Sequence, residues 1–172
     1  MIQIRKITNG NVYLDGQNLL GRVAEATLPE VKLKTQDHKA LGMEHEIEVP
    51  SGGYEKMEAK LKLAGFYPDA VTVAGDHRRA VPLTIRGNLQ TFDPQGLDDE
   101  VPVVVMLRGP FKGITLGALK QHEGPEPELN MIVWYMKVTV DGNDLLEVDV
   151  MASIHRVAGD DVLARYRDII GA

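Results

Sequence analysis

Side chains that could do acid–base chemistry or hold a metal ion are scattered along this chain of 172 residues. None of its five histidines falls at the HExxH spacing that brings two imidazoles to one face of a helix. The chain has no cysteine, which excludes disulfides, thiolate zinc sites, iron–sulfur clusters and a cysteine nucleophile. We interpret the histidines as surface or ordinary structural residues: His38, His45, His77, His122 and His155.

Two groups of acidic residues offer the oxygen ligands that a hard cation prefers. One is Asp98-Asp99-Glu100, in a segment whose Pro94 and Gly96 are typical of a loop. The other lies within Glu44–Glu48 and alternates in part with apolar residues, as the solvated face of a strand does. No serine has the context of a hydrolase nucleophile, and no glycine-rich phosphate-binding loop is present. We therefore predict no catalytic, cofactor-binding or metal-binding residues and no enzyme activity.

Charge and apolar patterning narrow the class of protein further. Lys and Arg number 19 against 25 Asp and Glu, a formal net charge of −6, whereas a nucleic-acid-binding surface needs clustered basic residues. The longest apolar run, Met131–Met136, is far shorter than the roughly 20 residues of a membrane-spanning helix. No secretory signal is evident, so we expect the protein to stay where it is made. Its length predicts a single domain over residues 1–172 with its own core.

A turn between two β-rich runs gives the strongest structural signal. Asp141-Gly142 separates the run Met131–Val140 from Leu145–Val150, and glycine accepts the positive φ that a tight hairpin turn requires. The sequence therefore predicts an antiparallel hairpin here. One face of its first strand is predicted to carry Ile132, Trp134, Met136, Val138 and Val140.

Further turn and strand signals predict an antiparallel meander. Asp15-Gly16 predicts an earlier hairpin with Leu19-Leu20 in its return strand, and Pro29 predicts a bend or a sheet edge. The segments Phe92–Glu100 and Gln121–Glu128 resemble linkers between strands. Additional strands are predicted at Val23–Leu28, Val31–Lys34, Ile47–Val49, Leu83–Arg86 and Val101–Leu107.

Helix signals are few. The residue types of Glu55–Leu63 favour a helix, but apolar residues alternate strictly with charged ones, so we predict a strand. Pro68–Ala74, followed by Gly75, predicts a short helix, although its Val and Thr would equally suit a strand. Asp160 is predicted to cap a final helix that ends at Gly171. The apolar stripe of that helix would contain Val162, Leu163, Tyr166, Ile169 and Ile170.

Several short segments follow one another in a specific order. The chain opens with Asn11–Gly16 and continues with Leu20–Pro29, then Lys32 and Lys34. Later segments are Gly42-Met43, Met57–Lys60, Leu107–Gly109, Tyr135–Gly142 and the closing Asp160–Ile170. Over nearly its whole length the chain thus resembles the major tail tube protein of contractile-tailed phages and R-type pyocins. It departs from that family at Leu41, where a second glycine is usual, and matches only loosely over residues 81–117.

The resemblance implies a mainly β (β+α) fold, an antiparallel β-sandwich or small barrel with a flanking helix and a C-terminal helix. It further implies hexameric rings whose inner sheets join into a channel and which stack into the inner tube of a contractile tail. Expected partners are other copies of the chain, the tail sheath protein, and baseplate and tape-measure proteins. DNA would pass through the lumen without specific binding, and acidic walls would suit a polyanion. The protein would belong to the virion, assemble in the bacterial host cytoplasm and have no membrane anchor.

The stretch Thr35–Glu48, rich in His, Lys and Glu, is interpreted as a projecting arm that contacts a neighbouring subunit or ring. The alternative is a mobile surface loop. Other functions stay open: the tube of a headless R-type bacteriocin, a ring protein of type VI secretion, a small β-barrel enzyme or a monomeric binding module. The predicted assembly-interface residues are Gln36, Asp37, His38, Lys39, Leu41, Gly42, Met43, Glu44, His45 and Glu46.

Overall fold

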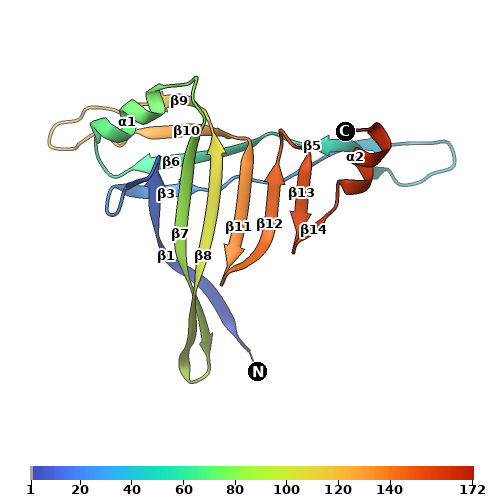
Figure 1. Cartoon of the computed structure of the whole chain (residues 1–172), viewed down its shortest axis with the longest axis horizontal. Helices are drawn as coiled ribbons and strands as arrows, with labels where there is room; N and C mark the ends of the chain where they lie inside the picture. Colours follow the sequence, from blue (N-terminus) through green and yellow to red (C-terminus); the bar gives the residue numbers. More distant parts are fainter. Residues whose placement is uncertain (1) are drawn as a thin grey trace.

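The computed structural model describes residues 2–172 and is dominated by antiparallel β-sheet, with two short helices (Figure 1). The predicted antiparallel, mainly β sandwich is confirmed. Its large sheet has eight strands, whose neighbours run in the order β14 (Asp160–Asp161), β13 (Ile154–Val157), β12 (Asn143–Asp149), β11 (Tyr135–Val140), β8 (Gly96–Gly109), β7 (Val81–Asp93), β1 (Ile4–Leu14) and β2 (Gln17–Asn18).

The remaining elements pack on one half of the large sheet or lie at its opposite end. A four-stranded sheet lies against the half formed by β1, β7 and β8, and α1 lies beside it (Figure 1). A separate two-stranded hairpin and α2 lie at the opposite end, near β13 and β14 (Figure 1). The bounds are β3 (Val23–Thr27), β6 (Met57–Leu63), β10 (Glu128–Val133) and β9 (Phe111–Thr115) for the four-stranded sheet, β4 (Leu33–His38) and β5 (Ile47–Tyr54) for the hairpin, α1 (Pro68–Gly75) and α2 (Ala164–Ile170).

The predicted strand at Glu55–Leu63 is confirmed as β6. Its apolar residues are almost fully buried between the two larger sheets, whereas Glu58, Lys60 and Lys62 face outward. These three form ion pairs with Lys112, Glu128 and Glu126, respectively, on or beside the neighbouring strands β9 and β10. Burial of alternate residues outweighs helix propensity here, because only a strand can place every second side chain in the core.

A continuous row of side chains crosses the inner face of the large sheet. The register pairs successive members across β1, β7, β8, β11, β12 and β13. The row runs Leu14, Leu83, Leu107, Met136, Val148 and His155, all of them buried. Five apolar side chains thus end in a histidine at the β13 end of the row.

Both predicted hairpins are confirmed, with one correction. Asp15 and Asp141 have φ of 50° and 49°, and each is followed by a glycine that also has positive φ, as two-residue turns require. The return strand after Asp15 is Gln17–Asn18, not Leu19-Leu20. The strand ends there because Leu19 turns into the core, where it is only 1% exposed, while its N–H donates to the Val12 carbonyl.

The run Met131–Val140 does not form one strand, so the predicted common face is wrong. The chain leaves the four-stranded sheet after Val133 and enters the large sheet at Tyr135. Trp134 marks the crossing, and its N–H donates to the Arg108 carbonyl. The crossing shifts the alternation, so that odd-numbered residues of β10 are buried whereas Met136 is the buried residue at the start of β11.

Two further segments differ from the sequence predictions. Phe92–Glu100 is not a linker: β7 and β8 continue through it and form a long hairpin that projects from the body of the molecule (Figure 1). Because both faces of this hairpin are solvated, its sequence lacks the alternation of apolar and polar residues that predicts a strand. The short helix at Pro68 is confirmed as α1, and α2 ends at Gly171 with φ of 73°, as predicted. Asp160, however, lies in β14, and the helix begins only at Ala164.

Candidate assembly surfaces

The residues considered for catalysis or metal binding do not converge. Within residues 2–172 no three acidic or histidine side chains lie together in a metal-binding arrangement. Asp98-Asp99-Glu100 lies in the projecting part of β8, where Glu100 accepts hydrogen bonds from Asn88 and Gln90. These bonds lower the pKa of Glu100, with the Gln90 contact the larger cause. Neither helix in the described part of the chain has the length and apolar character needed to cross a bilayer.

The segment Thr35–Glu48 forms most of the hairpin of β4 and β5, which we call the arm. Gln36 pairs with Val49 and His38 with Ile47, so the ends of the segment are ordered as strands. The arm extends past α2, away from the two packed sheets (Figure 1). Its assembly role stays a prediction, but the paired strands give it a defined shape.

The tip of the arm combines charged and apolar side chains. Lys39 and Glu46 form an ion pair across the tip, with 2.6 Å between Nζ and Oε1. Between them the N–H of Met43 donates to the Ala40 carbonyl and closes a turn in which Leu41 is fully exposed. Every predicted assembly-interface residue of Gln36–Glu46 is solvent-exposed within the described chain. The arm therefore presents an apolar tip on a charged stem.

The large sheet ends in two edges of different character. At one edge β2 pairs only with Tyr13 and Leu14 of β1, so within residues 2–172 the backbone of Ile4–Asn11 has no strand partner on its outer side. At the other edge β14 covers Arg156 and Val157, while Ile154 at the start of β13 is uncovered. A long open strand edge is a template for pairing with another chain.

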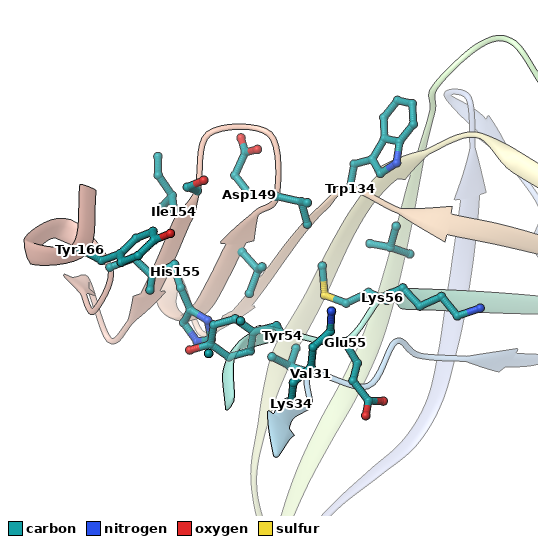
Figure 2. Close-up of a pocket in the computed structure, with 18 of the residues that line it drawn as sticks. Val31, Lys34, Tyr54, Glu55, Lys56, Trp134, Asp149, Ile154, His155 and Tyr166 are labelled. Atoms are coloured by element: carbon teal, nitrogen blue, oxygen red, sulfur yellow. The ribbon is translucent and has the colours of Figure 1, made fainter. Parts of the chain in front are cut away.

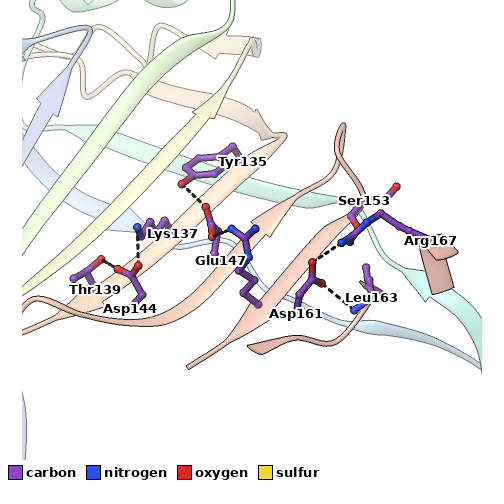
Figure 3. A network of polar contacts seen from close by, with 10 residues as sticks. Tyr135, Lys137, Thr139, Asp144, Glu147, Ser153, Asp161, Leu163 and Arg167 are labelled. Atoms are coloured by element: carbon purple, nitrogen blue, oxygen red, sulfur yellow. Dashed lines mark hydrogen bonds and ion pairs between the residues drawn. The ribbon is translucent and has the colours of Figure 1, made fainter. Parts of the chain in front are cut away.

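Charged side chains form a paired network on the outer face of the large sheet, opposite the core (Figure 3). Lys137, Glu147, Arg156 and Asp161 follow one another in register across four strands. Nη1 of Arg156 lies 2.7 Å from Oε2 of Glu147, and Nη2 of Arg167, in α2, lies 2.7 Å from Oδ2 of Asp161. Opposite charges therefore alternate across this part of the sheet.

The pairing shifts the ionisation of the network in consistent directions. The hydrogen bond from Arg156 is the main cause of the lowered pKa of Glu147. Burial, and then the hydrogen bond that its hydroxyl donates to Glu147, raise the pKa of Tyr135. The pKa of Asp161 falls to about 2, chiefly because Arg167 donates a hydrogen bond to it. At neutral pH the carboxylates of Glu147 and Asp161 therefore stay ionised and the Tyr135 hydroxyl stays protonated, so the network stays intact there.

A groove of about 780 Å³ lies between the base of the arm, the end of β12, the start of β13, and α2 (Figure 2). Its lining includes Tyr54, Trp134, Val148 and His155. The Tyr54 and His155 rings are 4.8 Å apart, centroid to centroid. His155 is only 7% exposed, and its Nδ1 atom has no hydrogen-bond partner within the described residues. The groove is thus an apolar hollow with one unsatisfied polar atom.

The apolar stripe predicted for the C-terminal helix is largely exposed. Val162, Tyr166, Ile169 and Ile170 each have more than half of their surface accessible, although Tyr166 also lines the groove. Met151, in the turn between β12 and β13, is 71% exposed. A cluster of this kind marks an interaction surface more often than a solvated one.

Sequence reasoning located the arm but missed the groove and the charged network. The network had a partial signal, since Lys137 and Glu147 occupy polar alternate positions of predicted strands. The groove had none, because its walls come from β5, β12, β13 and α2, which are distant in sequence.

Solved structures from a contractile injection system share the fold of this chain. The chain superposes on the sheath/tube terminator of the extracellular contractile injection system PVC with a TM-score of 0.55, at 9% identity and over 78% of this chain and 95% of that one. The sheath–tube complex of the same system gives a TM-score of 0.52 at 10% identity, covering 76% and 87%.

Sequence comparisons are more specific. The family model for phage tail tube protein FII matches residues 4–171, and the chain belongs to that family. It is 32% identical to the tail tube protein of Escherichia phage P2 over 99% of both chains. It is 25% identical to the major tail tube protein of Serratia phage KSP20, over 90% of this chain and 88% of that protein. These relatives are structural proteins, which confirms the prediction that the chain is not an enzyme.

Proposed function

We propose that this protein forms hexameric rings that stack into the inner tube of a contractile phage tail. The observation that carries the proposal is the open edge of β1 over Ile4–Asn11, set opposite the partly covered β13 edge of the same sheet. Pairing the β1 edge of one copy with the β13–β14 edge of the next satisfies backbone groups of both. A contact between two different surfaces repeats head to tail and closes into a ring when the rotation allows.

In this proposal the outer face of the large sheet lines the channel. Its charged network is internally paired, so a DNA polyanion would find little unpaired positive charge to bind there. The tube would serve as the conduit through which DNA enters the host cell. The projecting β7–β8 hairpin adds negative charge, which would also keep DNA from binding. Its acidic residues are Asp93, Asp98, Asp99 and Glu100.

The arm is proposed to bind a neighbouring subunit or ring. Its fully exposed Leu41 and half-exposed Met43 are suited to burial against another surface. Residues 1–172 act as one tail tube domain, since one cluster of buried residues joins the two larger sheets.

Sheath, baseplate and tape-measure proteins are the proposed partners, and the virion is the proposed location, reached after assembly in the bacterial host cytoplasm. The family match and the structural likeness to a sheath–tube complex support the sheath and virion assignments. A headless bacteriocin or a type VI secretion-like ring would use the same surfaces. Genes for a capsid beside the gene for this chain would separate a phage from either alternative.

Sedimentation velocity at increasing protein concentration tests ring formation through the β1 edge. Thr8 is suited to a matched pair of variants, because it sits at a bulge where β1 has no register partner in β7. Thr8→Pro removes a backbone N–H from β1 and fixes φ, whereas Thr8→Ala keeps the N–H. We expect hexamers for the unchanged chain and Thr8→Ala, and a folded monomer by circular dichroism for Thr8→Pro. A monomer at every concentration for the unchanged chain would contradict the proposal.

A further inference from the structure

The two edges of the large sheet lie at different heights along its strands. The register leads from Val12 of β1, strand by strand, to Val157 of β13, and Val157 pairs with Asp160 of β14. The β14 edge is therefore level with Val12, whose carbonyl already accepts the Leu19 N–H. The uncovered segment Ile4–Asn11 extends further toward the projecting β7–β8 hairpin (Figure 1). Copies that joined without a shift would leave this segment unpaired.

Side chains already cap part of that segment. The Gly10 N–H donates to Oδ1 of Asn9, and the Val12 N–H donates to Oδ1 of Asn11, each at 2.8 Å. A neighbouring strand would have to displace these asparagines before it could bond there. The edge is thus most accessible over Ile4–Thr8, which ends at the bulge of β1.

Backbone groups in this part of β1 alternate between β7 and the open side. On β7 the even-numbered residues face β1, because the carbonyl of Pro82 accepts an N–H from the β1–β2 turn. Gln90 belongs to the same set and pairs with Lys6, so the backbone of Lys6 faces β7. The N–H and carbonyl groups of Arg5 and Ile7 are consequently turned to the open side.

The outer side of β14 presents the backbone of Asp161. Asp160 follows a two-residue turn and pairs with Val157, so its backbone faces β13. Val162 faces β13 too, since its N–H donates to the His155 carbonyl. Asp161 lies between them and turns its N–H and carbonyl outward. β1 and β14 also run in the same direction, because six antiparallel pairings separate them in the sheet. Copies related by rotation about a ring axis would therefore meet here as parallel strands.

We propose that β14 of one copy pairs in parallel with Ile4–Thr8 of the next copy, with Asp161 opposite Lys6. In a parallel ladder a residue bonds to the two neighbours of the residue opposite it. The Asp161 N–H then donates to the Arg5 carbonyl, and the Ile7 N–H donates to the Asp161 carbonyl. This inference rests on the proposed ring, and it fixes which residues of the two edges meet.

The side chains of both edges suit this alignment. Arg5, which pairs with the buried Thr91, comes to lie beside Asp160 on the inner face of the sheet. Both charged side chains are exposed, and neither forms an ion pair within residues 2–172. Ile7 comes to lie beside Val162, and these side chains are 54% and 55% exposed. Opposite charges and apolar pairs across neighbouring strands stabilise a sheet.

The shift between copies matches the geometry of a closed ring of strands. Asp160 is level with Val12 in its own copy but meets Arg5 in the next copy. These two positions on β1 pair with Ile85 and Thr91 of β7, six residues apart, which corresponds to about 20 Å along the strands. The six strand spacings from β1 to β14, plus the one between copies, span about 34 Å. The strands would then tilt by about 30° from the ring axis, near the roughly 35–45° of closed β-barrels.

Cysteine cross-linking tests the alignment, because the chain contains no cysteine of its own. A preparation of Val162→Cys is mixed before assembly with one of Ile7→Cys, imaged by electron microscopy and oxidised. A dimer with one chain of each kind is expected in assembled rings. The matched control uses Gln17→Cys on β2 in place of Ile7→Cys, because an unshifted sheet would set Gln17 directly beside Val162.

Each outcome decides between the two alignments. Rings that cross-link through Ile7→Cys, and not through Gln17→Cys, support the inference. A cross-link through Gln17→Cys overturns it and leaves the proposed ring intact, and so do rings without either cross-link. Absence of rings from the unchanged chain would contradict the proposed function itself, and the inference with it.

Charge reversal gives a second readout that does not depend on disulfide geometry. Arg5→Glu and Asp160→Lys should each raise the protein concentration needed for ring assembly by about tenfold, because like charges would then face each other. The double variant Arg5→Glu/Asp160→Lys restores the pair and should assemble as the unchanged chain does. Arg78→Glu, at an exposed arginine before β7, is the control and should have little effect. Sedimentation velocity measures all four variants. Normal assembly of both single variants, or a double variant that assembles no better than they do, would overturn the inference.

Discussion

Arg167 of α2 and Asp161 of β14 form an ion pair, with 2.7 Å between Nη2 and Oδ2. The other carboxylate oxygen of Asp161 accepts the N–H of Leu163, the residue just before the helix. Arg167 also donates to the carbonyl of Ser153, at the margin of the groove. One arginine and one aspartate thus attach the C-terminal helix to the edge of the large sheet.

This pair predicts a specific acid dependence of stability. The pKa of Asp161 is lowered from 3.8 to about 2 in the folded protein, so the ionised form stabilises the fold above pH 3.8. That contribution is lost as the pH falls from 3.8 toward 2, because in this range the unfolded state takes up a proton that the folded state does not. Asp161→Asn should lower the thermal midpoint at neutral pH, by an amount that shrinks over this acid range.

Circular dichroism melts from neutral pH downward measure the effect, with Asp160→Asn as the matched control. The structure gives the Asp160 side chain no ion pair or hydrogen bond within residues 2–172. Equal thermal midpoints of Asp161→Asn and the unchanged chain at neutral pH would show that the ion pair between Asp161 and Arg167 does not stabilise the fold.

Gly109 is predicted to tolerate no side chain. A Cβ atom there would lie 1.8 Å from the carbonyl oxygen of Ile132, which is backbone and cannot move aside. Gly109→Ala should therefore cost more than about 4 kcal/mol or prevent folding. Gly113→Ala is the control, since a Cβ atom at Gly113 meets nothing within 4 Å. Urea unfolding compares the two, and equal stability would mean that β8 and β10 do not approach so closely.

The alternation of β6 predicts losses of stability of very different size at neighbouring residues. Leu61 is 1% exposed, so Leu61→Ala should lower the free energy of unfolding by about 2–5 kcal/mol. Lys60 faces solvent and pairs with Glu128 across 3.4 Å, so Lys60→Ala should cost at most about 1 kcal/mol. Denaturant titration followed by tryptophan fluorescence measures both, and similar losses for the two variants would contradict the strand.

The arm is predicted to serve assembly and not folding. Within residues 2–172 its two strands pair only with each other, and Gln36–Glu46 adds no residue to the buried core. Replacing Gln36–Glu46 by an Asn-Gly turn should leave the melting temperature of the monomer nearly unchanged and abolish full-length tubes. The double variant Lys39→Glu/Glu46→Lys keeps the ion pair and is expected to assemble. Normal tubes from the shortened chain would refute the role of the arm.

Local signals predicted those parts of the fold that depend on nearby residues. Asp141-Gly142 predicts its hairpin because the required φ values are set within the turn itself. The alternation in β6 was equally informative, since the burial of each residue depends only on the face of the strand on which it lies. Trp134, by contrast, marks a crossing between sheets that depends on the distant carbonyl of Arg108. No period within the run Met131–Val140 could have revealed it.

The candidate assembly surfaces also differ in whether local sequence could predict them. The arm could be located because Thr35–Glu48 is a polar stretch between strands. The groove could not, since the burial of His155 depends on Tyr54 and α2, which fold against β13 from distant parts of the chain.

Electron microscopy of the purified protein over a range of concentrations tests the central claim most directly. The account predicts rings with six-fold symmetry that stack into hollow tubes as concentration rises. A uniform population of single folded chains at every concentration, with no rings or tubes, would contradict it.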